Sequence, residues 1–270
     1  MESGEAELVY KITPDDFREH MKRKNKAMVD KRMTIGEAVE RYIRDGDLVA
    51  MGGVSFVRLS MAVVYEIIRR GIRIYCAAGT RNLDVDMLID NDCILGLEIG
   101  YILGLEVLGI PRYTRQKVEN GLRSGRLKVT EWCNGAMAWR HKAAAMGLPF
   151  LPVRDLLGTD TFKKSAAKKV KCPFTGIDVA LLPALYVDTA VVHVHRADIY
   201  GNCQIEGAAN EDPYKAMGAK NVIITTEKIV DTEEIRRNPE RTHLPYYYVD
   251  AVVEVPYGAH PSNMPGMYYA

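Results

Sequence analysis

The sequence predicts an α/β protein built on a Rossmann-like, mostly parallel sheet with helices on both faces. Short apolar segments rich in β-branched residues alternate with helical patterns, which is the order expected of parallel strands joined by crossover helices. The runs at residues 222–226 and 249–255 are predominantly apolar or β-branched, as in strands buried on both faces. With 270 residues, 47% of them hydrophobic, the chain is long enough for one large domain with a substantial core.

The beginning of the chain is expected to form a polar arm, residues 1–30, ahead of a domain at residues 31–270. The arm ends in a basic run at residues 21–26, and Pro14 followed by Asp15 and Asp16 marks the start of a helix. We therefore expect a partly helical, solvated arm.

The domain begins with a helix whose start is marked by a capping box, because Thr34 is followed three residues later by Glu37. Gly46 ends this helix, and the apolar strand at residues 48–51 then breaks at a Gly-Gly pair. We expect further helices at residues 61–68, 84–90, 118–125 and 137–146, strands at residues 72–77, 93–97, 127–130, 179–185, 190–195, 222–226 and 249–255, a turn at residues 186–188, and a surface loop or β-excursion at the charged residues 161–171.

Charge and patterning exclude several classes of partner. The formal net charge is +1 and no basic face interleaved with aromatic residues is visible, so nucleic acid is not expected as a partner. The apolar runs are much shorter than a membrane span requires, and the N-terminus has no apolar leader segment, so we expect a cytoplasmic protein with no membrane partner. The five cysteines include no CxxC pair, which predicts neither a zinc ribbon nor a thioredoxin-type site.

A Gly-Gly turn and an arginine form the first candidate site. Gly52 and Gly53 lie between a strand and a helix, where their N–H groups could face an anion or a carbonyl oxygen. No G-x-G-x-x-G fingerprint is present, so a dinucleotide site is disfavoured. Arg58 follows the turn and suits a carboxylate or a phosphate. A purely structural turn and a surface arginine are the alternatives.

Histidines follow two other predicted strands. His193 and His195 are two residues apart and share one face of a strand, and His260 follows the strand at residues 249–255. Ligands bind at the carboxyl ends of strands in open α/β sheets, so a shared cleft is expected there. A core position and a substrate contact are both open for His193 and His195. A metal site lacks a third ligand, and no metal is expected.

Six blocks of the sequence are informative together: residues 33–53 (MTIGEAVERYIRDGDLVAMGG), 86–89 (DMLI), 147–153 (GLPFLPV), 172–202 (CPFTGIDVALLPALYVDTAVVHVHRADIYGN), 250–253 (DAVV) and 257–262 (YGAHPS). In this order, they resemble the A subunits of the family I coenzyme A transferases of the glutaconate type. Because they span most of the predicted domain, the resemblance implies a sheet and helices of the CoA-transferase type.

The resemblance also implies an activity, because enzymes of this family move coenzyme A from an acyl-CoA to a free carboxylic acid. A glutamate of a partner B subunit would attack the thioester, so no catalytic residue is expected on this chain. Coenzyme A would be a co-substrate, with no permanently bound cofactor. This chain would supply substrate contacts from His193 and His260, N–H donors from Gly52 and Gly53, and Arg58 for a carboxylate of a dicarboxylic or otherwise polar acid.

Departures from the family pattern bear on the chemistry. Val54 stands where the family usually has phenylalanine after the Gly-Gly pair. Asn134 lies where transferase relatives tend to have an amide and ring-cleaving CoA-ester hydrolases have a catalytic glutamate. An amide cannot act as a general base, but it can hydrogen-bond a carbonyl oxygen. Asn134 therefore favours a transferase over the alternatives, a hydrolase on the same scaffold or a non-catalytic scaffolding subunit. Glu119–Gly121 (ENG) resembles the partner's nucleophile motif, but its neighbours differ and we interpret it as coincidence.

Overall fold

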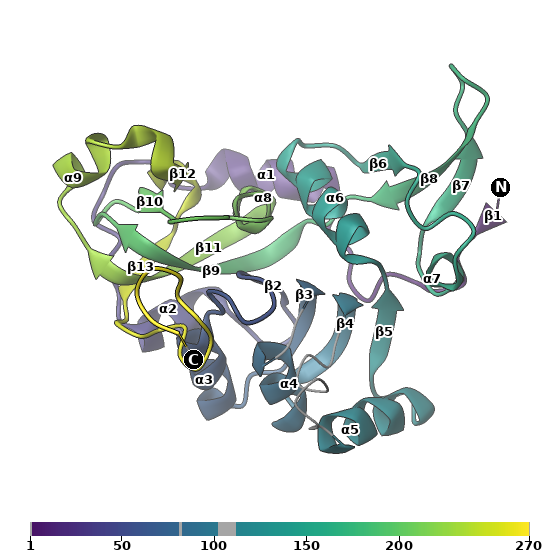
Figure 1. Ribbon diagram of the computed structural model, residues 1–270, viewed down its shortest axis with the longest axis horizontal. Helices are drawn as coiled ribbons and strands as arrows, with labels where there is room; N and C mark the ends of the chain where they lie inside the picture. The colour runs from purple at the N-terminus through teal and green to yellow at the C-terminus, as the bar shows by residue number, and fades with distance from the viewer. Residues whose placement is uncertain (1, 81–82, 102–111, 270) are drawn as a thin grey trace.

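A nine-stranded sheet forms the centre of the part of the chain that the computed structural model describes, residues 2–80, 83–101 and 112–269 (Figure 1). Its strands are β2 (Leu48–Met51), β3 (Ile74–Thr80), β4 (Ile94–Tyr101), β5 (Lys128–Glu131), β9 (Val187–Ala197), β10 (Cys203–Gln204), β11 (Ala219–Ile229), β12 (Thr242–Leu244) and β13 (Ala251–Glu254). The parallel strands lie in the order β5-β4-β3-β2-β9-β11-β13. Near the end of β9, β10 and then β12 add antiparallel strands. The predicted mostly parallel sheet is confirmed.

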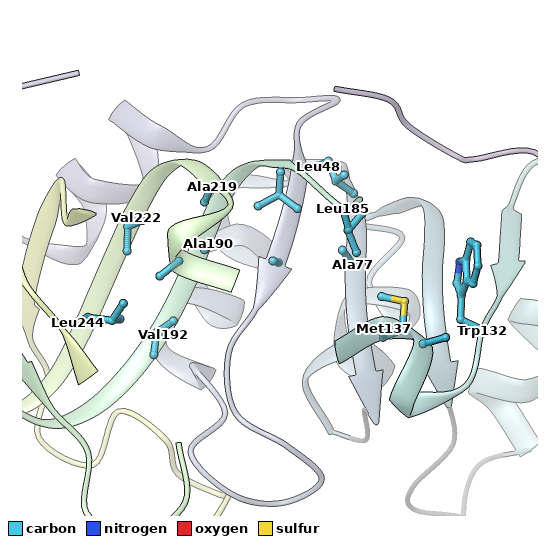
Figure 2. Close-up of a cluster of buried hydrophobic side chains, with 14 of the residues drawn as sticks. Leu48, Ala77, Trp132, Met137, Leu185, Ala190, Val192, Ala219, Val222 and Leu244 are labelled. Carbon is cyan, nitrogen blue, oxygen red and sulfur yellow. The ribbon is translucent and has the colours of Figure 1, made fainter. Parts of the chain in front are cut away.

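The apolar strands are explained by burial on both faces of the sheet. On β2, Leu48 and Ala50 point into one hydrophobic cluster, which Figure 2 shows, whereas Val49 and Met51 point into another on the opposite face. Alternate residues of a strand point to opposite faces, so both sets must be apolar when both faces are covered. The predicted turn at residues 186–188 is wrong, since β9 already begins at Val187.

Helices cover both faces, as predicted. In chain order they are α1 (Pro14–Arg23), α2 (Ile35–Tyr42), α3 (Met61–Arg70), α4 (Leu83–Asp90), α5 (Arg112–Arg123), α6 (Asn134–Ala145), α7 (Asp160–Lys163), α8 (Asp212–Met217) and α9 (Thr232–Arg236), with 3₁₀ turns η2 (Pro239–Arg241) and η3 (Tyr246–Tyr248). Apolar residues of α2, α3 and α4 join the cluster that contains Val49, and those of α6 and α8 join the cluster that contains Leu48.

Local signals set the start of α2 and the end of α3, whereas α2 itself ends at Tyr42, ahead of the predicted end at Gly46. The Thr34 N–H and hydroxyl both donate to the Glu37 carboxylate, and the Glu37 N–H donates to the Thr34 hydroxyl, which is the expected capping box of α2. Gly71 ends α3 with φ of 66°, the left-handed conformation that glycine adopts without steric cost.

A second, antiparallel sheet lies beside the main one, on the right in Figure 1. Its order is β1-β7-β8-β6, with β1 (Glu2–Ser3), β6 (Phe150–Val153), β7 (Lys168–Lys171) and β8 (Asp178–Pro183). The charged segment at residues 161–171, expected as a loop or β-excursion, thus contains part of a short helix and one strand of this sheet. Strand β7 has exposed or half-buried residues throughout, so its sequence lacks an apolar strand pattern.

The N-terminal segment is attached to the domain at several points. The Val9 N–H donates to Glu98 at 2.9 Å, Ile12 is buried, and the Lys24 ammonium lies 2.5 Å from Asp250. The expected helix is present as α1 and has no buried residue, and these contacts join the otherwise largely exposed arm to the domain. None of the helices within the described residues is both long and apolar enough to cross a membrane.

Candidate active site

The turn after β2 is held by hydrogen bonds inside the protein. The Gly52 N–H donates to the Val191 carbonyl at 2.7 Å, and the Gly53 N–H donates to Oδ1 of Asp212 at 2.8 Å. The expectation that these two N–H groups face a substrate oxygen is therefore corrected, because each already has an acceptor in the fold.

Close backbone contacts explain why this turn uses glycine. A Cβ on Gly52 would lie 2.6 Å from the Val191 carbonyl oxygen. Gly53 has φ of +81°, and its Cβ would lie 2.5 Å from the carbonyl oxygens of both Val57 and Arg58. Backbone atoms cannot move aside as a flexible side chain can, so a larger residue would distort the turn.

Arg58 is fully buried, and its guanidinium forms an ion pair within the chain. Its guanidinium lies 2.7 Å from Oδ2 of Asp212 and donates to the carbonyl oxygens of His193, at 3.3 Å, and Ala208, at 3.0 Å. The buried Lys215 ammonium approaches the same aspartate at 3.4 Å. These contacts correct the expectation that Arg58 meets a substrate carboxylate. They make it a positioning residue that ties the turn to α8 and β9.

His193 lies in a buried hydrogen-bond network that joins β9, β11 and the C-terminal segment. Its Nε2 is 2.8 Å from Glu227, and its Nδ1 is 2.8 Å from the Thr225 hydroxyl. Burial lowers the pKa of His193, although the Glu227 carboxylate opposes this shift. Glu227 also accepts the Tyr268 hydroxyl and the Tyr257 N–H, and these donors with His193 lower the pKa of Glu227 against the effect of burial. The neutral ring thus donates from Nε2 to a charged carboxylate.

Both ring nitrogens of His195 also form hydrogen bonds within the protein. The Glu206 N–H donates to its Nδ1 at 3.1 Å, so its Nε2 carries the proton and donates to the Pro265 carbonyl at 2.9 Å. Each ring nitrogen of His193 and His195 therefore has a partner in the protein. Within the described residues, no group of three histidine, cysteine or acidic side chains is placed to hold a metal ion.

Residues 256–269, here called the strap, cross the turn region after leaving β13. The Arg58 N–H donates to the Asn263 carbonyl at 2.9 Å, and the Tyr65 hydroxyl donates to the His260 carbonyl at 3.3 Å. The His260 side chain itself is exposed. The structure thus brings the Gly-Gly turn, Arg58, His193 and the His260 segment together.

Asn134 lies farther along the same edge of the sheet. It is exposed and is the first residue of α6, and its Oδ1 is 2.6 Å from the position that a Cβ on Gly100 of β4 would occupy. Glu211 lies over Gly79 of β3 in a similar way, at 3.0 Å. Since β3 lies between β2 and β4, Asn134 and the Gly-Gly turn are at two places along one carboxyl edge.

Several polar residues of this edge were not predicted from the sequence to belong to the site. Asp212 and Lys215 are fully buried, Glu227 is almost so, and each carries an ion pair or hydrogen bond described above. A proline after Asp212 marks a helix start, but no local signal pairs it with Arg58, which is 154 residues away. The triplet that begins with Glu119 lies on α5, where this carboxylate pairs with Arg115 and Arg123 on the helix surface.

The chain belongs to the coenzyme A transferase family, since residues 32–255 match the family described as Coenzyme A transferase. A protein of Archaeoglobus fulgidus named only as uncharacterized is 50% identical over all of this chain, and the chain spans 60% of the length of that relative. The A subunit of glutaconate CoA-transferase from Acidaminococcus fermentans is 34% identical over 89% of this chain and 79% of its own length.

Solved structures agree with this assignment. The crystal structure of glutaconate coenzyme A-transferase from Acidaminococcus fermentans superposes with a TM-score of 0.82 at 33% identity, over 88% of this chain and 80% of that chain. The decarboxylase AibA/AibB superposes with a TM-score of 0.76 at 32% identity, over 88% of each chain. Among sequence relatives, the IpdA subunit of a cholesterol ring-cleaving hydrolase of Mycobacterium tuberculosis is 29% identical over 86% of this chain and 82% of its own length. One scaffold therefore carries several named activities.

Proposed function

We propose that this chain is the A subunit of a heteromeric acid CoA-transferase. It moves coenzyme A, its co-substrate, between an acyl-CoA and a free dicarboxylic or otherwise polar acid. The nucleophilic glutamate is on a partner B subunit. The family match and the names of the transferase relatives support this reaction class.

The observation that carries the division of labour is that three buried acids, Asp212, Glu227 and Glu98, already accept hydrogen bonds from donors within the protein. Asp212 binds Arg58 and the Gly-Gly turn, and Glu227 accepts three donors. Glu98 accepts Trp132 Nε1 at 2.6 Å and the Arg140 guanidinium at 2.8 Å. A carboxylate with internal donors is a weak nucleophile, which supports a nucleophile from the partner.

The reaction then proceeds in two displacements. The partner's carboxylate attacks the thioester carbonyl, the bond to sulfur breaks, and coenzyme A leaves as a thiolate, which gives an acyl-glutamyl anhydride. The thiolate attacks the glutamyl carbonyl of the anhydride, releasing the first acid and leaving an enzyme-CoA thioester. The acceptor acid reverses these steps. Each displacement places negative charge on a carbonyl oxygen.

Asn134 is the residue of this chain best suited to donate a hydrogen bond to that carbonyl oxygen. It is exposed, and its side-chain amide donates a hydrogen bond without a change of charge. It also opens α6, where unsatisfied N–H groups give the helix end a partial positive charge. Arg58 and the Gly-Gly turn hold the neighbouring backbone, and the exposed His260 side chain is a proposed substrate contact.

Intact-mass spectrometry of the co-purified subunits tests this proposal. The complex is incubated with an acyl-CoA and treated with borohydride, which reduces an enzyme-CoA thioester. A mass change on the partner alone is the expected result, together with coenzyme A appearing on an added acceptor acid. A mass change on this chain would contradict the proposal. Free coenzyme A without transfer would indicate a hydrolase, and CO₂ release with the thioester intact would indicate a decarboxylase.

A further inference from the structure

We propose that this chain has a second ligand site, a cationic cavity that binds a small phosphate ester. The cavity, here called the amino-edge cavity, has a volume of about 300 Å³, and Arg73, Lys117 and Arg126 are among the residues that line it. Sites for small molecules begin at this size. The site is independent of the proposed function, because the amino-edge cavity and the candidate active site are at opposite edges of the sheet.

Sheet topology places the amino-edge cavity. Strands β3, β4 and β5 are parallel neighbours, so their first residues lie at one edge of the sheet, opposite the carboxyl edge. Arg73 directly precedes β3, Ile94 begins β4, and Arg126 is two residues ahead of β5. Helix α5, which lies below β5 in Figure 1, adds Lys117 to the lining. Four elements that are separated in sequence thus contribute to one cavity.

Positive charge predominates in the lining. Beside the three cationic side chains, Asp92 is the one acid among the described residues that line the cavity, which gives a formal net charge of +2. The Lys117 ammonium lies 3.1 Å from Asp92. Neither Arg73 nor Arg126 forms an ion pair within residues 2–80, 83–101 and 112–269. The charges of these two guanidinium groups therefore remain for an anion.

The cavity combines these charges with a fixed ammonium and an apolar lining. Lys117 donates to the Asp90 carbonyl at 2.6 Å, which holds it at the C-terminal end of α4. A cation that is already held in place loses little conformational entropy when a ligand binds. Ile89, Ile94 and Leu127 are buried in the lining. Apolar walls lower the local dielectric and strengthen the attraction between the cations and a bound anion.

A phosphate ester matches this lining in charge and in polarity. Guanidinium groups present a planar fork of donors that binds two phosphate oxygens at once. A phosphate monoester carries a charge of about −1.5 to −2 at pH 7, which balances the net charge of the cavity. The apolar residues suit the carbon chain of an ester. None of the described residues that line the cavity is aromatic, so no ring stacks on a nucleobase.

Isothermal titration calorimetry of the full chain with butyl phosphate, at low ionic strength, tests the proposal. Arg73→Gln and Arg126→Gln are each expected to raise the dissociation constant about fivefold or more, since each removes charged donors. Asp92→Asn is expected to lower it about threefold, because it removes the acidic charge of the lining. Such a gain of affinity does not arise from misfolding.

The matched control is Arg123→Gln, which removes the same charge from the end of α5. Arg123 is not among the described residues that line the cavity, and its side chain is 76% exposed and lies 3.6 Å from Glu119. This variant is expected to bind butyl phosphate as the wild type does. Inorganic phosphate is expected to bind the wild type about fivefold more weakly, because it has no carbon chain to bury.

Each other outcome overturns the inference. No binding by the wild type, unchanged or weaker binding by Asp92→Asn, or an equal loss in Arg123→Gln means that the cavity is not a specific site. Inorganic phosphate that binds as tightly as the ester makes the free ion the ligand, and tighter binding of glutarate makes it a dicarboxylate. Binding that both cavity arginine variants leave unchanged and coenzyme A displaces places butyl phosphate in the candidate active site. CoA transfer by the complex would then leave the proposed function standing.

Discussion

Arg58 and Asp212 form a buried ion pair across 154 residues of sequence, with the guanidinium 2.7 Å from Oδ2. The other carboxylate oxygen of Asp212 accepts the Gly53 N–H. One side chain therefore neutralises a buried cation and fixes the conformation of the turn after β2. This relationship changes the expected part of Arg58 from a substrate contact to a support for the site.

Removing one partner of this ion pair should be strongly destabilising. Asp212→Ala leaves the Arg58 guanidinium buried without its counter-charge, which costs about 3–5 kcal/mol in comparable pairs. The double variant Arg58→Met, Asp212→Leu removes both charges and should lose less. Urea unfolding of the three proteins measures the difference. A double variant at least as unstable as Asp212→Ala would contradict this account.

Gly53→Ala should destabilise the chain more than Gly71→Ala. Both glycines have positive φ, but a Cβ at Gly53 would lie 2.5 Å from two backbone oxygens, whereas nothing lies within 4 Å of a Cβ at Gly71. Gly71→Ala should therefore show only the backbone cost, about 1–2 kcal/mol. We expect Gly53→Ala to lose ~2 kcal/mol more, because backbone atoms must shift. Equal urea midpoints for the two variants would count against the close contacts.

Asn134→Ala should slow the proposed CoA transfer without unfolding the chain. Removing one donor to a developing oxyanion lowers kcat by about 100-fold or more in other enzymes. Asn120→Ala is the control, because Asn120 is another exposed helical asparagine, on α5. The measurement, on the complex with the proposed B subunit, is the steady-state rate over a range of acyl-CoA concentrations. A rise in KM with unchanged kcat would assign Asn134 to substrate binding alone.

Asp86→Asn should stabilise the chain most at high pH. Burial, followed by repulsion from Asp84 and Asp90, raises the pKa of Asp86 from 3.8 to about 7. The folded state thus holds a proton that the unfolded state releases between these values, and stability falls as pH rises through that window. The gain from the variant should grow by about 1.4 kcal/mol per pH unit there and stay constant above about pH 7.

The control for this pH dependence is Asp92→Asn, because the Asp92 side chain is 85% exposed. Urea unfolding of both variants and the wild type between pH 5 and pH 8 provides the comparison. A gain from Asp86→Asn that does not change with pH would show that the carboxyl group is not protonated in the fold.

Local signals made much of the fold predictable. The capping box at Thr34 and the glycine after α3 act through neighbouring residues, and the apolar centres of β9 (residues 190–192) and β11 (residues 222–224) show their burial on both faces directly in sequence. The resemblance of the sequence blocks to the coenzyme A transferase family predicted the type of sheet. Strand β7 was not assigned as a strand, because it is charged and lies in a small sheet whose residues are not apolar throughout.

The candidate site was predictable in position but less so in contacts. The Gly-Gly turn, His193 and Arg58 do lie together, because parallel strands end at one edge. The hydrogen-bond partners of each side chain, such as Asp212 and Glu227, are distant in sequence. Only the tertiary structure shows that they lie next to it. Donors expected to face substrate were therefore already paired with the fold itself.

Strand β9 lies in the middle of the sheet but late in the sequence, so β2 cannot pair with it until β9 has been synthesised. β2 pairs with β9, and the Leu48 N–H bonds to Asp188, 140 residues later. The strands β2 to β5 emerge first, and translation from residue 131 to residue 187 takes on the order of seconds. During that interval the edge of β2 has no neighbour, and an open apolar edge is prone to pair with other chains. A ribosome that pauses in this interval would expose four strands of the sheet with the edge of β2 unpaired.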